Sequence, residues 1–154
     1  MSETINVENK KQNRQKPPLS VGRIAREILA GTALSLVALL VVNVIGFVLV
    51  GKGKDEYAGF GFLTILLTLF PPLNGWISAV GVHLVGSRGK QTGSFLLTLA
   101  GGFVGGLVAF VALLSLLWIR VEIVLLAPLL LLIPPIFATL GFNLTRKYEE
   151  PPSS

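Results

Sequence analysis

The chain has 154 residues, of which 52% are hydrophobic and 14% are charged, and its net charge is +5. Soluble domains carry about 25% charged residues, so this composition favours a membrane protein. The absence of cysteine excludes disulfide bonds, thiolate metal sites and cysteine nucleophiles. The positive charge is divided among short segments between long apolar stretches, and we therefore expect no nucleic-acid partner.

Residues 1–27 form a basic, polar segment that we expect to be a disordered cytoplasmic tail. Residues 1–20 contain hardly any apolar side chains and cannot bury enough surface to offset the entropy cost of ordering. The basic side chains suit the anionic lipids of the inner leaflet. A cleaved signal peptide is a poor fit, because the apolar run that follows is too long and leads into Lys52 and Lys54.

Four apolar stretches predict four membrane spans, at residues 28–50, 60–85, 95–118 and 123–144. Each is about as long as the roughly 20 apolar residues that cross a bilayer as a helix, or longer. The third and fourth stretches are joined by a very short segment, so their helices are expected to be antiparallel neighbours. The sequence therefore predicts an all-α integral membrane protein, a four-helix transmembrane bundle without a separate soluble domain.

The basic residues are distributed unevenly over the segments that flank the spans. Ten of the 13 Lys and Arg residues lie in 1–27, in the loop 86–94 and in the tail 145–154, which share one side of the membrane. The other side carries the remaining three. The positive-inside rule then places both termini in the cytoplasm, with the protein in the cell membrane. We expect the polar tail 145–154 to be unstructured.

The third span carries a band of small residues. Gly101, Gly105 and Ala109 follow one another at a four-residue spacing, with Gly102 and Gly106 beside them. Lipid tails are as apolar as leucine, so helices associate in a bilayer through the close backbone approach that small residues allow. The band predicts close packing, either within the chain or against a second copy or another membrane protein.

The second and fourth spans contain the proline pairs Pro71-Pro72 and Pro134-Pro135. Proline lacks an N–H group, so we expect the second helix to be strongly kinked or split, with Asn74 bonded to a freed carbonyl. These residues form either a structural wedge or a solute or gating site like those at broken transporter helices. The alignment of the two pairs also suggests an internal repeat of two helical hairpins.

His83 is the only histidine and lies near the end of the second span. It serves either a structural or headgroup contact or the handling of a proton or ligand. In the following loop, Arg88, Lys90 and Ser94 are candidates for binding a lipid phosphate, although a plain connecting turn is the alternative. Ser94 is also expected to cap the third helix.

No acidic or basic residue lies inside a predicted span, and Glu27 and Glu122 lie at span boundaries. Proton-coupled transporters usually need an embedded ionisable residue, and catalysis usually needs an acid–base pair. We therefore expect no enzyme activity, cofactor or metal. The leading hypothesis is an accessory or assembly subunit, or a homo-oligomer packed through the third helix. The alternative is a small channel or transporter for a neutral or hydrophobic solute, with its site at the proline-containing helices.

Overall fold

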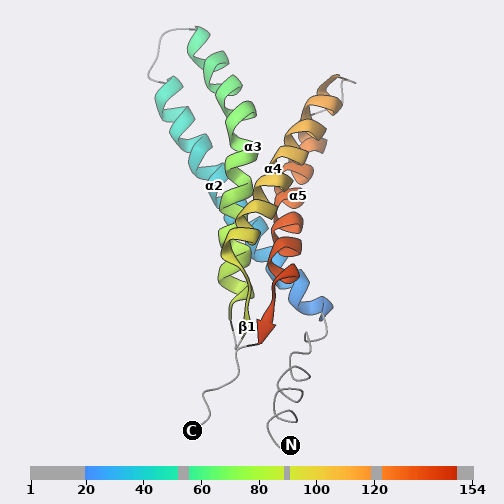
Figure 1. The fold of residues 1–154 in the computed structure, drawn as a ribbon. Helices are drawn as coiled ribbons and strands as arrows, with labels where there is room; N and C mark the ends of the chain where they lie inside the picture. Colours follow the sequence, from blue (N-terminus) through green and yellow to red (C-terminus); the bar gives the residue numbers. More distant parts are fainter. Residues whose placement is uncertain (1–19, 52–55, 89–90, 119–122, 149–154) are drawn as a thin grey trace, which may run out of the picture.

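The fold consists mainly of α-helices. The computed structural model describes residues 20–51, 56–88, 91–118 and 123–148 (Figure 1). The described residues form four helices, namely α2 (Val21–Gly51), α3 (Glu56–Gly86), α4 (Phe95–Trp118) and α5 (Ile123–Leu144). Two short strands, β1 (Gln91–Thr92) and β2 (Lys147–Tyr148), follow α3 and α5 in the chain.

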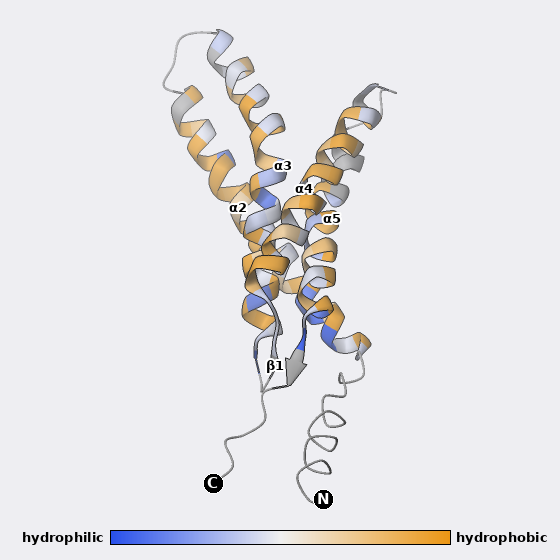
Figure 2. Cartoon of the chain, viewed as in Figure 1, coloured by the Kyte–Doolittle hydropathy of each residue, from blue (hydrophilic) through white to orange (hydrophobic). Residues whose placement is uncertain are grey.

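Three helical segments are long and apolar enough to cross a membrane, at Val21–Val48, Gly59–Gly86 and Phe95–Leu116. The described apolar part of α5, Leu130–Leu144, is shorter. Hydrophobic residues cover most of each helix, whereas hydrophilic residues gather at the end where β1 lies (Figure 2). These features confirm the prediction of a mainly helical integral membrane protein.

The helices form two hairpins, α2 with α3 and α4 with α5 (Figure 1). We call the end of the helices beside β1 and β2 the strand end, and the opposite end the far end. The hairpins lie against each other toward the strand end and diverge toward the far end (Figure 1). The described chain both begins and ends at the strand end, because α2 starts there and β2 lies there.

The proline pairs do not split their helices. Helix α3 runs through Pro71-Pro72, and α5 runs through Pro134-Pro135, each as a single element. Membrane helices tolerate proline where neighbouring helices and polar side chains satisfy the freed backbone groups. Of the two alternatives predicted for the second span, a strong kink or a split, the structure excludes the split.

Both predicted tails contain ordered residues. Helix α2 begins at Val21 rather than at residue 28, and the Ser20 carbonyl accepts the N–H groups of Arg23 and Ile24. At the other terminus, β2 pairs antiparallel with β1, an arrangement possible because both segments emerge at the strand end. The predictions of disorder were wrong for 21–27 and for 147–148. Residues 1–19 and 149–154 lie outside the described residues.

Candidate functional site

Glu27 is a carboxylate in the interior of the strand end. Its side chain in α2 is 0% exposed. Arg23 Nε donates a hydrogen bond to Glu27 Oε1 at 2.8 Å, and Asn143 Nδ2 donates one to Oε2 at 2.8 Å. Both carboxylate oxygens are thus paired, which a buried charge requires. Because Asn143 belongs to α5, the carboxylate joins the two hairpins.

Further hydrogen bonds extend this arrangement to α3 and to the segment after α5. The Arg23 guanidinium also donates to the carbonyl of Gly86 at the end of α3. Arg146, which is 5% exposed, donates from Nη1 to Asn143 Oδ1 at 3.4 Å. We call Arg23, Glu27, Gly86, Asn143 and Arg146 the Glu27 cluster. It connects α2, α3 and α5 at the strand end.

The sequence interpretation of Glu27 was incomplete. Its position near a span boundary does not leave it in water, because side chains of α2 and α5 enclose it. The expectation that the interior holds no charge was therefore wrong. A signal was present in the four-residue spacing of Arg23, Glu27, Gly31 and Ser35, which places them on one face of a helix.

Asn74 is buried between α3 and α5. Its side chain is 0% exposed, and Nδ2 donates to the carbonyl of Leu130 at 3.1 Å. In a regular helix this carbonyl would accept the N–H of residue 134, but Pro134 has none. Asn74 therefore does bond a carbonyl freed by proline, although on α5 rather than on its own helix. Asn43, an amide in α2, is instead exposed and donates to the Leu39 carbonyl of its own helix.

Other buried polar side chains lie on α2, α3 and α5. Ser78 Oγ donates to the Gly75 carbonyl at 2.9 Å. In contrast, Ser35 Oγ, Asn74 Oδ1 and Thr139 Oγ1 have no hydrogen-bond partner among the described residues. The interior between α2, α3 and α5 thus contains more polar groups than its own hydrogen bonds satisfy.

The glycines of α4 lie against the neighbouring helices of the same chain. A Cβ on Gly102 would overlap the carbonyl of Gly75 in α3. A Cβ on Gly105 would lie 2.8 Å from the Cα of Pro134 in α5. Gly106 likewise meets α3, Gly101 meets α5, and Ala109 is buried. These small residues are therefore in use within the chain.

The two proline pairs lie at the same level beside α4. A Cβ on Gly106 would meet the Pro71 carbonyl, while neighbouring Gly105 meets Pro134. One turn away, Gly102 meets Gly75 and Gly101 meets Phe137 and Ala138. Helices α3 and α5 therefore flank α4 in equivalent register.

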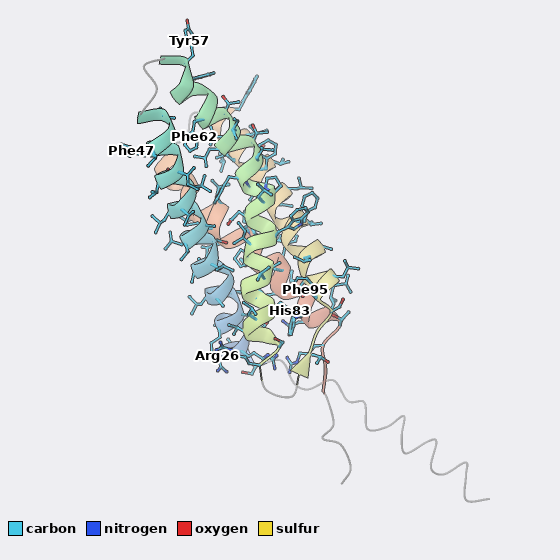
Figure 3. The ribbon with its side chains drawn as sticks, turned by 90° about the vertical axis from the view of Figure 1, so that its left-hand side faces the viewer. Arg26, Phe47, Tyr57, Phe62, His83 and Phe95 are labelled. Atoms are coloured by element: carbon cyan, nitrogen blue, oxygen red, sulfur yellow. The ribbon has the colours of Figure 1, made fainter. Side chains whose placement is uncertain are left out.

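His83 is half-buried near the strand end (Figure 3). Its ring centroid lies 4.9 Å from that of Phe95 and 5.7 Å from that of Phe142. Its Nδ1 has no hydrogen-bond partner among the described residues. The ring is thus packed between aromatic side chains, and the described contacts assign it no ligand.

The candidate phosphate site is partly occupied by the protein itself. Ser94 Oγ accepts the N–H of Leu97 at 3.3 Å, as expected of a helix cap. The Ser94 N–H donates to Thr145 Oγ1 at 2.9 Å, so a phosphate at this amide would have to displace Thr145. Arg88 is exposed, and Lys90 lies outside the described residues.

The described residues contain no group of three His, Asp or Glu side chains suited to a metal ion. No family model matches the sequence, and comparisons with curated proteins and solved structures give no match. The Glu27 cluster and the buried polar residues of α2, α3 and α5 therefore form the candidate functional site.

Proposed function

We propose that this protein is a small non-enzymatic channel or transporter for a neutral solute. The observation that supports this most is the fully buried Glu27, bonded across the hairpins where they lie together. Taking a carboxylate out of water costs several kcal/mol, and an apolar contact would hold helices together without that cost. Ionisable groups inside membrane proteins commonly mark the path of a solute or ion.

The polar residues suggest where the path lies. Buried polar side chains from α2, α3 and α5 extend from the strand end toward the centre of the helices, and these are Glu27, Ser35, Asn74, Ser78 and Thr139. In our proposal the solute passes along this three-helix junction. The Glu27 cluster closes the junction at the strand end, and the diverging hairpins give access from the far end.

Two premises of the subunit hypothesis no longer support it. That hypothesis assumed that the glycines of α4 are available to another chain, whereas Gly102 and Gly105 contact α3 and α5. It also assumed an interior without charge, whereas Glu27 is buried. The contacts of the α4 glycines and the burial of Glu27 therefore favour a transport function over an accessory subunit.

The proposal includes four membrane spans and a cytoplasmic strand end. The described arginines Arg23, Arg26, Arg88 and Arg146 all lie at or beside helix ends on this side, which supports the orientation by the positive-inside rule. The exposed Arg26 and Arg88 would contact anionic lipid headgroups.

Single cysteines test the orientation, because the chain contains none of its own. Tyr57, at the far end, is 88% exposed (Figure 3). A membrane-impermeant maleimide should label Tyr57→Cys in intact cells, and it should label Ser20→Cys only after permeabilisation. The reverse pattern would contradict the orientation.

Flux into proteoliposomes tests the transport function. Stopped-flow light scattering with glycerol and urea gradients should show faster entry than into protein-free vesicles. Asn74→Leu should abolish the increase, while the exposed Asn43→Leu, the same substitution, should retain it. Entry at the protein-free rate for both probes would contradict transport of small neutral solutes.

An accessory or assembly subunit is the second candidate. It is favoured by the divergence of the hairpins at the far end, where Phe47 is 80% and Trp118 89% exposed (Figures 1 and 3). A helix of another protein would cover such side chains. The mass and composition of the complex extracted in mild detergent distinguish the two candidates. A defined complex with other proteins supports a subunit, and a single-component particle supports a self-contained transporter.

A further inference from the structure

A tight contact at Gly31 fixes the relative register of α2, α3 and α5. A Cβ on Gly31 would lie 2.6 Å from Pro135 Cβ and 3.0 Å from the Ser78 carbonyl oxygen. Helix α2 runs antiparallel to α3 and α5. One helical turn toward the far end is therefore about four residues later in α2 and about four residues earlier in α3 and α5. One turn nearer the far end, the three helices present Ser35, Asn74 and Leu131.

Each of these three residues brings a polar atom that its own helix leaves without a partner. Ser35 and Asn74 are both 0% exposed, and Ser35 Oγ and Asn74 Oδ1 have no hydrogen-bond partner among the described residues. Pro135 has no N–H to donate to the Leu131 carbonyl. An unsatisfied buried polar group costs about 1–3 kcal/mol, so Ser35 Oγ and Asn74 Oδ1 call for a partner, and the Leu131 carbonyl at the same level lacks its usual helical donor.

The orientation of the Asn74 amide determines what that partner must offer. Its Nδ2 is engaged by the Leu130 carbonyl, so the group left to bind a partner is the acceptor Oδ1. The Leu131 carbonyl is a second acceptor, and the Ser35 hydroxyl supplies a donor. The partner must therefore donate two hydrogen bonds and accept one.

We propose that a bound water molecule occupies this level and joins α2 to α3 and α5. Water donates to Asn74 Oδ1 and to the Leu131 carbonyl, and it accepts from the Ser35 hydroxyl. Buried waters typically make about three such bonds to groups that are otherwise unsatisfied. A solute hydroxyl has only one hydrogen to donate and leaves one acceptor unpaired. Divalent cations such as Ca²⁺ take six to eight oxygen ligands, more than this level offers.

The site does not depend on transport. Ser35 Oγ and Asn74 Oδ1 are buried and need a hydrogen-bond partner whether or not a solute passes, so the water serves the junction in either case. An experiment that finds no bound water therefore does not bear on transport, and an experiment that finds no flux does not bear on the water.

Radiolytic labelling in ¹⁸O water tests the proposal on the full-length protein in lipid nanodiscs. An X-ray pulse turns bound water into hydroxyl radicals that oxidise the side chains beside it, and peptide mass spectrometry locates the products. We expect oxidation at Pro135 and Leu131, although Pro135 is fully buried. The exposed Tyr57 reports the dose.

Ser35→Val replaces the hydroxyl with a methyl group and should reduce oxidation at Pro135 to background. The matched control is Ser115→Val in α4, where the exposed hydroxyl bonds only to Val111 of its own helix at 2.8 Å. If Ser35→Val does not fold, Ser35→Ala removes the hydroxyl without adding volume. The proposal is wrong if Pro135 and Leu131 stay unoxidised while Tyr57 reacts. It is also wrong if both Ser35 variants keep the wild-type labelling.

Discussion

The strand end and the far end satisfy their polar side chains in different ways. At the strand end, Glu27 bonds to Asn143 of another helix, and Arg23 reaches Gly86 of a third. Toward the far end, Asn43 and Thr64 each donate to a carbonyl of their own helix. Polar groups therefore connect the hairpins at one end and are satisfied locally at the other. Asn43 and Thr64 therefore keep their hydrogen bonds even where the hairpins diverge.

Apolar contacts follow the same division. At the far end, a Cβ on Gly46 of α2 would overlap the ring of Phe62 in α3, a contact within one hairpin (Figure 3). Nearer the strand end, Gly102 lies against Gly75 and Gly31 against Pro135, which are contacts between hairpins. The free energy that holds the hairpins together should therefore reside mainly in the half of the helices nearer the strand end.

The largest effect is expected for Glu27→Ala. The substitution leaves Arg23, whose side chain is 15% exposed, without its carboxylate partner. Breaking a buried ion pair in this way costs about 3–5 kcal/mol of the free energy of unfolding. Steric-trap unfolding in micelles measures this cost. The control Arg26→Ala removes an exposed charge at the same end and should change stability very little. Equal effects of the two variants would mean that the buried ion pair stabilises the protein no more than an exposed charge does.

Gly102→Ala is expected to have the next largest effect. The added Cβ meets the backbone of Gly75, which cannot move without shifting α3, and overpacking of this kind costs about 1–3 kcal/mol. Gly61→Ala is the matched control, because no atom lies within 4 Å of a Cβ at that position. Alanine is about 0.5–1 kcal/mol better than glycine inside a helix, so this control should be slightly stabilising. The opposite signs can be checked in the same unfolding measurement.

Asn74→Leu should destabilise the protein less. It leaves the Leu130 carbonyl without the donor that replaces the missing N–H of Pro134. Interhelical hydrogen bonds in membranes contribute about 1–2 kcal/mol in model peptides. Asn43→Leu removes an exposed amide that bonds only within α2, and its effect should be smaller. Equal losses would mean that the bond between the hairpins is no more valuable than a local one.

Local patterns in the sequence predicted the features that depend on one helix at a time. Apolar length predicted the long helices, of which three are long and apolar enough to cross a membrane. Four-residue spacing predicted the packed face of α4, and the chemistry of proline predicted a freed carbonyl for Asn74. The partner of Asn74 was not predictable, because it depends on how α3 and α5 are placed relative to each other. For the same reason the burial of Glu27 could not be predicted from the sequence. Its distance from the span centre can be read from the sequence, but its enclosure by Asn143 cannot.

The pairing of β1 with β2 also depends on how separate elements are placed relative to each other, and it could not be predicted from the sequence. Neither two-residue strand has a sequence pattern of its own, and the two meet only because the loop after α3 and the segment after α5 emerge at the strand end. The interaction of Ser94 N–H with Thr145 Oγ1 has the same origin and ties α4 to the end of α5.

Thr145→Val is therefore expected to produce the smallest and most local effect. It keeps the shape of the side chain and removes the acceptor of the Ser94 N–H, a loss of about 0.5–1.5 kcal/mol for a neutral hydrogen bond. Hydrogen exchange should accelerate at Ser94 and not at residues near the far end, because the contact joins elements only at the strand end. Thr64→Val, an exposed site with a bond inside its own helix, should leave exchange at Ser94 unchanged. Faster exchange along the whole of α4 in Thr145→Val would mean that the two ends are coupled, and that the strand end does not hold the hairpins independently of the far end.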